Sequence, residues 1–253
     1  MLFVNVLRKE MMEQWRTKRL LIVVAVLVVF GLASPLLAKV TPDLLRSVPD
    51  MPAGLAELIP VPSIADAVGQ YIKNMSQFGI LLAVLMSMGV VIQEKERGTA
   101  VMMLTHPVSP LAFLLAKFTA LGLTFVLSLF ISALGCWYYT LLLFDTLAWG
   151  PFLALNGLML VVFLVYVALA LFCSTLARTQ AASAGLAFAG LVLVGGVGSL
   201  PRIGEYFPGQ LFNWGAALVL GGDASGWPAL WISFALMILF LATAWLILRM
   251  QEI

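Results

Sequence analysis

The residues best placed to do chemistry lie in one short stretch, residues 94–117, between two long apolar runs. Five of its first six residues are charged or glycine, and Glu94, Lys95, Glu96 and Arg97 alternate in sign. Neighbouring carboxylates and cations of this kind make charge-assisted contacts to another surface. They do not form a catalytic constellation, so we expect no catalytic residue here. The stretch is typical of a docking surface for a protein that this chain does not contain.

The same stretch also contains residues that begin and end a short helix. Gly98 ends the preceding helix, Thr99 is a suitable N-cap for a helix over about 99–105, and Pro107 stops it. The Ser-Pro pair at 109–110 caps and begins the next helix. A short helix lying across one membrane face is therefore predicted between two spans.

Two methionines, Met102 and Met103, fall on this short helix beside four charges. A purely structural loop needs only a few polar residues, whereas exposed methionines are adaptable contact residues at binding surfaces. The pattern favours a docking knob.

Several chemistries are missing from the sequence. None of the 21 glycines precedes a lysine, so the chain has no GxxxxGK[ST] phosphate loop and we expect any ATP and Mg²⁺ to bind a partner. The single histidine, His106, has too few partners for a metal site, and Cys136 and Cys173 lie in apolar runs typical of buried thiols. No ionisable residue lies mid-span, which argues against a proton-driven carrier and an intramembrane protease.

The elements that position this stretch are membrane spans. The chain is 62% hydrophobic and only 10% charged, against about 25% charged in soluble domains. A span needs about 20 apolar residues, and six runs qualify. They are roughly 20–38, 76–93, 111–142, 151–177, 181–200 and 228–248. We predict an all-α, six-span membrane protein in a 20–253 transmembrane domain.

Lysine and arginine predict the orientation. With the N-terminus inside, inner segments hold ten of these residues and outer segments four. The inner ten are Arg8, Lys9, Arg16, Lys18, Arg19, Lys95, Arg97, Lys117, Arg178 and Arg249. Both termini and the 94–110 segment are therefore expected in the cytoplasm, and the protein in the cell (inner) membrane.

Three flanking segments complete the predicted organisation. Residues 1–19 read as a basic amphipathic helix in the inner interface, with Phe3, Leu7, Met11 and Trp15 spaced four apart. The proline-rich outer segment 39–75 restarts as a helix near Ser63. The outer segment 201–227 is aromatic but broken by proline and glycine. It suits either short re-entrant helices or an ordinary interfacial aromatic belt.

The fifth span is rich in small residues, which let helices approach closely. Two readings stay open, close packing within one subunit or a subunit interface or pathway. The candidate positions are Ala181, Gly185, Ala189 and Gly190. Mid-span hydroxyls such as Thr124, Ser132 and Ser183 either bond their own helix or line a pathway.

The sequence resembles the permease family of type-2 ABC transporters. The match rests on Glu94, Glu96, Arg97, Gly98, Thr99, His106, Pro107, Val108, Ser109 and Lys117, together with the span number and the amphipathic lead. The resemblance implies a coupling helix at about 98–106 seated in a separate ATPase subunit. It also implies a dimer of permeases, as a homodimer or with a paralogue, and two ATPase subunits.

The predicted function is the permease subunit of an ABC exporter that moves an amphipathic or hydrophobic substrate outward. The predicted ATPase contacts are Glu94, Glu96, Arg97, Gly98, Thr99, Met102, Met103 and His106. The alternative is an assembly that transmits ATPase force to an extracytoplasmic partner protein without moving solute. A passive channel or scaffold is a further rival. We expect no metal, no cofactor in this chain and no nucleic-acid partner.

Overall fold

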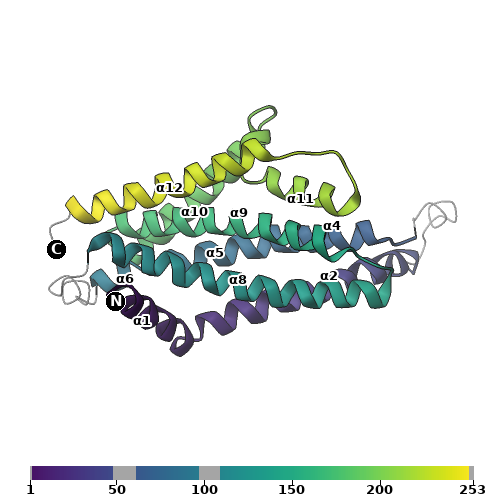
Figure 1. Ribbon diagram of the computed structural model, residues 1–253, viewed down its shortest axis with the longest axis horizontal. Coiled ribbons are helices and arrows are strands. Elements are labelled where there is room, and N and C mark those ends of the chain that lie inside the picture. The colour runs from purple at the N-terminus through teal and green to yellow at the C-terminus, as the bar shows by residue number, and fades with distance from the viewer. Residues whose placement is uncertain (1, 48–60, 97–108, 251–253) are drawn as a thin grey trace.

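The computed structural model describes residues 2–47, 61–96 and 109–250, which form a bundle of long helices (Figure 1). Within these residues six helices are long and apolar enough to cross a membrane, which confirms the all-α, six-span prediction. The elements in chain order are α1 (Leu2–Arg16), α2 (Arg19–Arg46), α4 (Ile64–Asn74), η1 (Met75–Gly79), α5 (Ile80–Ser87), α6 (Ile92–Glu96), α8 (Pro110–Leu143), α9 (Trp149–Leu176), α10 (Gln180–Gly198), η2 (Gly204–Tyr206), α11 (Gln210–Leu220) and α12 (Trp227–Met250).

Helix α9 is the centre of the bundle. Of its most apolar 18-residue window 72% is buried, against 11% for α10 and 17% for α12. It packs against α5, α8, α10, α11 and α12. The outer faces of α10 and α12 are therefore left for lipid or for another chain, since an apolar surface of this size is not stable in water.

The second span is longer than its apolar run. Ser63 caps it, with its backbone N–H and its hydroxyl both donating to Asp66 Oδ2 at 2.8 Å. One span then runs over Ile64–Glu96 and includes the π-helical turn η1. The restart expected near Ser63 is thus joined directly to the run expected over 76–93. The turn brings the backbone at Gly79 so close to the Phe163 ring that a β-carbon there would overlap it.

The connection between α10 and α12 contains the two short helices η2 and α11. Helix α10 packs along α9, with Gly190 against Leu169 and Gly195 near Tyr166. Further toward the start of α9, helix α11 packs against it instead, with Gly215 against Leu155. Short helices in 201–227 are therefore present, and their return into the membrane stays a prediction.

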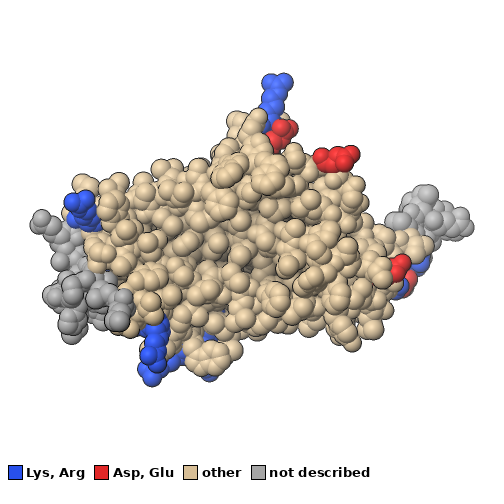
Figure 2. All heavy atoms as spheres, in the orientation of Figure 1, with Lys and Arg blue, Asp and Glu red and all other residues tan. Residues whose placement is uncertain are grey.

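The bundle has two distinct ends. The end that carries α1, α6, the start of α8 and the C-terminal end of α12 is called the proximal end, and the end at the α8–α9 junction the distal end (Figure 1). Figure 2 shows charged side chains at both ends and on the α10–α11 connection, while the long sides are almost free of charge. This distribution is that of a membrane-spanning bundle.

Candidate functional site

The proximal end holds the two helix termini that flank the predicted docking segment. Helix α6 ends at Glu96, and α8 begins at Pro110 after Ser109, whose hydroxyl accepts a hydrogen bond from the Ala112 N–H at 3.2 Å. The predicted cap and first-turn proline are confirmed. The predicted contact residues Arg97, Gly98, Thr99, Met102, Met103 and His106 lie outside the described residues.

Lys117 is the central charge of this end. Its side chain is 1% exposed, and its ammonium donates to Glu10 Oε2 at 3.0 Å and Oε1 at 3.1 Å. It also donates to Glu94 Oε1 at 2.9 Å and lies 4.8 Å from the centre of the Phe113 ring. One buried cation therefore joins α1, α6 and α8.

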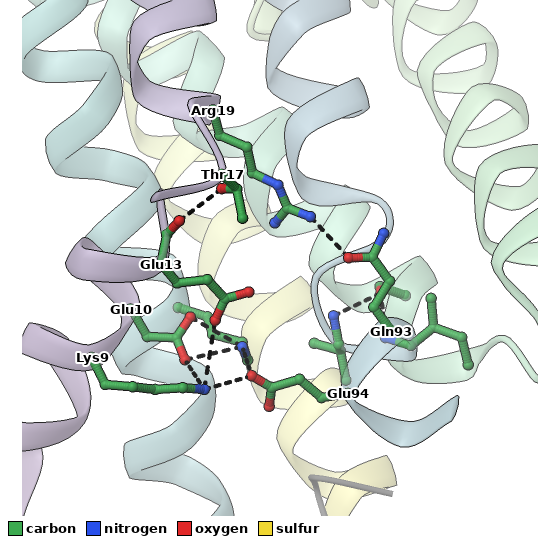
Figure 3. A network of polar contacts seen from close by, with 11 residues as sticks. Lys9, Glu10, Glu13, Thr17, Arg19, Gln93 and Glu94 are labelled. Carbon is green, nitrogen blue, oxygen red and sulfur yellow. Dashed lines mark hydrogen bonds and ion pairs between the residues drawn. The ribbon is translucent and has the colours of Figure 1, made fainter. Parts of the chain in front are cut away.

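A second lysine closes the same cluster (Figure 3). The Lys9 ammonium lies 2.7 Å from Glu94 Oε1, 3.1 Å from Glu10 Oε1 and 3.7 Å from Glu13 Oε2. Burial by itself would lower the pKa of Lys9, but the hydrogen bonds and charges of Glu94 and Glu10 outweigh burial and raise it. Lys9 is thus charged throughout the neutral range. We call Lys9, Glu10, Glu94 and Lys117 the ion clasp.

The clasp is a set of ion pairs rather than a metal centre. Carboxylate oxygens of Glu10, Glu13 and Glu94 lie within 4.8 Å of one another, as metal ligands would. Two ammonium groups occupy the space among them and supply two positive charges, so a divalent cation would have to displace both lysines. Taking such ions out of water costs on the order of several kcal/mol each, which only close pairing offsets. The arrangement therefore selects one relative position of the three helices.

Helix α1 turns a polar stripe inward. Val6, Glu10 and Gln14 are buried, four residues apart, and Gln14 Oε1 accepts a hydrogen bond from the buried Thr124 hydroxyl. The structure has a helix where one was expected, and two of its polar side chains face α8, because α8 offers Lys117 and Thr124 as partners. The place of this helix in the membrane interface stays a prediction.

Helix α6 is also tied to α9 and α10. The Ser174 hydroxyl accepts hydrogen bonds from the backbone N–H groups of Val91 and Ile92, each at 3.1 Å. Val91 lies in the turn that separates α5 from α6, and Ile92 is the first residue of α6, so the serine replaces partners that a continuous helix would supply.

Two charged side chains extend these ties. The Lys95 ammonium donates to the Thr175 carbonyl at 2.7 Å, and Glu96 Oε1 accepts from the Gln180 N–H at 3.0 Å. Glu96 thereby places a carboxylate at the N-terminus of α10, where the helix dipole favours it. On the other side, the Arg19 guanidinium donates to Gln93 Oε1 at 2.8 Å. Polar side-chain contacts thus tie α6 to α1, α2, α8, α9 and α10.

The predicted site residues fall in different environments. Glu94 is buried inside the clasp and serves the chain's own packing, whereas Glu96 lies at the surface beside α10. Direct contact of either carboxylate with an ATPase stays a prediction. For Glu94, the burial assigns the carboxylate to positioning α6.

The small residues of α10 also fall in two environments, an exposed face and a face packed against α9. Ala181, Gly185 and Ala189 are exposed on the chain, and no atom outside α10's own backbone lies within 4 Å of a β-carbon built at Gly185. A β-carbon at Gly190 would lie 3.0 Å from Leu169 of α9. Packing within the subunit therefore accounts for Gly190 and not for the other three. The Ser132 hydroxyl donates to the Leu27 carbonyl of α2, and the Ser183 hydroxyl, in the first turn of α10, donates to the Met88 carbonyl just past the end of α5.

Sequence reasoning did not assign Lys9 and Glu10 to this site. The available signal was the spacing of Val6, Glu10 and Gln14, which places two polar residues and a valine on one face. A second signal was Lys117, since a lysine two turns inside an apolar run needs a buried counter-charge.

Comparison with known proteins bears on the whole chain. Residues 4–249 match the model of a family described as ABC-2 family transporter protein. A protein of Bacillus subtilis (strain 168) described as "Uncharacterized transmembrane protein YxlG" is 24% identical over 253 residues, covering 97% of this chain and 97% of its own length.

Proposed function

The chain belongs to the ABC-2 transporter family as a multi-pass membrane permease subunit, and we propose that it is the membrane half of an ATP-driven exporter. In this proposal a separate cytoplasmic ATPase seats residues 98–106 and binds the ATP and Mg²⁺. Two permeases, as a homodimer or with a paralogue, pair with two ATPase subunits.

The ion clasp is the observation that carries the proposal. An ATPase that pushes on a short segment moves the spans only if the ends of that segment are held rigidly. Lys117 joins the helix that precedes the segment to the helix that follows it, through Glu94, and joins both to α1 through Glu10. A push at 98–106 then moves α6, α8 and α1 together. The permease shifts between two conformations because the ATPase binds these conformations with different affinities.

An amphipathic or hydrophobic cargo fits the interior of the bundle. In the described part of the chain the buried polar groups inside the spans, apart from the ion clasp, are hydroxyls and amides. Thr124, Ser132 and Asn156 are bonded to their neighbours, whereas the Ser87 hydroxyl is buried without a partner among the described residues. Because no buried charge lines the middle of a span, a bare ion would lack the counter-charges that replace its hydration shell. The proposed path lies between two permeases.

The first test is co-purification of the full-length permease with its ATPase in mild detergent. The double variant M102D/M103D should lose the ATPase and ATP-dependent transport while inserting normally. The control is M250D, which changes an 82%-exposed methionine at the same end of the bundle. Retention of the ATPase and of transport by M102D/M103D would overturn the proposed coupling helix.

The same complex distinguishes export from force transmission. Cargo-stimulated ATPase activity in proteoliposomes is the result that export requires. A stable extracytoplasmic partner bound through 39–75, with ATPase activity indifferent to any cargo, would instead assign the chain to the force-transmitting class.

The second test concerns the permease dimer. Gly185→Leu adds bulk to an open face, so it should weaken dimerisation and leave the stability of the single chain unchanged. Gly190→Leu should instead lower the single chain's stability, since it meets Leu169. The measurement is dimer mass by light scattering together with the apparent Tm. An unchanged dimer in Gly185→Leu would remove the α10 face from the interface.

A further inference from the structure

The outward face of α1 carries a groove bordered by cations. Met11, Met12 and Trp15 line it with Arg8 and Arg16, and its volume is about 410 Å³. The Trp15 side chain is 62% exposed and that of Met12 50%. In Figure 2 cationic side chains project from this end of the molecule beside uncharged surface. This face is polar at its edges and apolar between them.

The acidic side chains of α1 pair with lysines, whereas its two arginines lie on the outward face. The acids Glu10 and Glu13 both lie within 4 Å of the Lys9 ammonium, and Glu10 also pairs with the buried Lys117. Among the described residues no carboxylate lies within 4 Å of either guanidinium, Arg8 or Arg16. The outward face therefore has a net positive charge, to which the exposed Lys18 in the turn before α2 adds.

We propose that the outward face of α1 binds anionic phospholipid headgroups, with Arg8 and Arg16 on the phosphates and Met12 and Trp15 among the upper acyl chains. Arginine recognises phosphate oxygens with two parallel N–H donors, and tryptophan is favoured at the headgroup level. The two arginines are eight residues apart, or about 12 Å along a helix, so they engage two neighbouring lipids. Charge complementarity selects anionic over zwitterionic lipids.

The ion clasp connects this surface to the docking segment. Glu10 is on the inward face of the helix that carries Arg8 and Arg16, and Lys117 joins it to Glu94 of α6. Lipids that hold α1 at one depth thereby hold α6 and α8 in register. An effect of these lipids on ATPase activity rests on the proposed function, since it requires an ATPase docked between α6 and α8. Lipid binding to α1 does not depend on the proposed function.

The binding test uses the purified full-length permease without ATPase in a neutral detergent. Bound lipids are counted by native mass spectrometry during titration with phosphatidylglycerol or phosphatidylcholine. Wild type should retain phosphatidylglycerol in preference to phosphatidylcholine. The variant R8Q/R16Q should bind phosphatidylglycerol roughly 30-fold more weakly, since each surface cation contributes about a factor of five.

The matched control is R249Q, which removes a surface arginine beside Trp245 at the same end of the bundle. It should bind phosphatidylglycerol as wild type does. Equal affinity of wild type and R8Q/R16Q, or equal retention of the two lipids by wild type, would overturn the proposal. Displacement of phosphatidylglycerol by millimolar inorganic phosphate would also overturn it, because the groove would then be a phosphate-ion site.

A second measurement tests the consequence for the ATPase. In nanodiscs, ATPase activity of the assembled complex should rise with the phosphatidylglycerol fraction, and R8Q/R16Q should abolish that rise. If lipid binding is selective but ATPase activity ignores lipid composition, the lipid site stands and its link to the docking segment fails.

Discussion

The proximal and distal ends of the bundle are held by different forces. At the proximal end, ion pairs join α1, α6 and α8, and Lys117 is almost completely buried among them. At the distal half, neutral hydrogen bonds link the helices, as in Tyr71 Oη to Asn156 Oδ1 at 2.6 Å and Asn74 Nδ2 to Ser34 Oγ at 2.8 Å.

The difference between ion pairs and neutral hydrogen bonds indicates that the proximal end is the one held in a single geometry. A neutral hydrogen bond contributes about 1 kcal/mol and tolerates small shifts. A buried ion pair adds little net stability but loses on the order of 3–5 kcal/mol when one partner is removed. The proximal end therefore tolerates little change in the relative position of its helices, which suits an end that carries the two helix termini, Glu96 and Pro110, on either side of the proposed docking segment.

The largest expected effect comes from Lys117→Met. It leaves the buried carboxylates of Glu10 and Glu94 with Lys9 alone to compensate two negative charges, so the stability should fall by about 3–5 kcal/mol. The apparent Tm in detergent and retention of the ATPase measure the loss. The triple variant E10Q/E94Q/K117M removes the three buried charges together, leaves Lys9 beside Glu13 and should recover most of the Tm. A Tm for Lys117→Met equal to wild type would show that the clasp is not stabilised as described.

Ser174→Ala should have the next largest effect. It leaves the N–H groups of Val91 and Ile92 without the hydroxyl they share, at a cost of about 2–3 kcal/mol. Because these groups hold the start of α6, ATPase retention should fall together with the Tm. Ser174→Thr keeps the hydroxyl and is the comparison variant. If Ser174→Ala lowers the Tm but the permease keeps its ATPase in full, the position of α6 does not control ATPase docking.

Tyr71→Phe tests the distal half with a smaller change. It removes the hydroxyl that donates to Asn156 and should cost about 1–2 kcal/mol. The Tm should fall while ATPase binding stays at the wild-type level, because no clasp residue is touched. Loss of ATPase binding in this variant at a temperature well below its Tm would contradict the division between the two ends.

The smallest effect concerns pH. The raised pKa of Lys9 means that its stabilising contribution is complete below the ordinary value of 10.5 and is lost only as pH rises through the higher folded-state pKa. The Tm difference between wild type and Lys9→Met should therefore stay constant from about pH 6 to about pH 9. A difference that shrinks within this range would show that Lys9 is not held by Glu94 and Glu10.

Much of the fold was predictable because membrane insertion leaves a strong local signal. Long apolar runs identify the spans, and Ser63 and the Ser-Pro pair at 109–110 mark helix starts through their own backbone preferences. Such features depend on a few neighbouring residues. The extension of the second span to Ile64 was harder to predict, since Asp66 and Lys73 interrupt its apolar pattern.

The candidate site was only partly predictable for the opposite reason. The sequence by itself determined the membrane class, the six spans and the Ser-Pro start of α8 after the proposed docking segment, and it contains no GxxxxGK[ST] pattern. Only the tertiary structure decided that Glu94 points inward, that Glu10 meets Lys117 and that Arg8 and Arg16 point outward. Glu10 and Lys117 are 107 residues apart. Helix periodicity indicates which residues share a face, but the direction of that face depends on which buried charge the neighbouring helix presents.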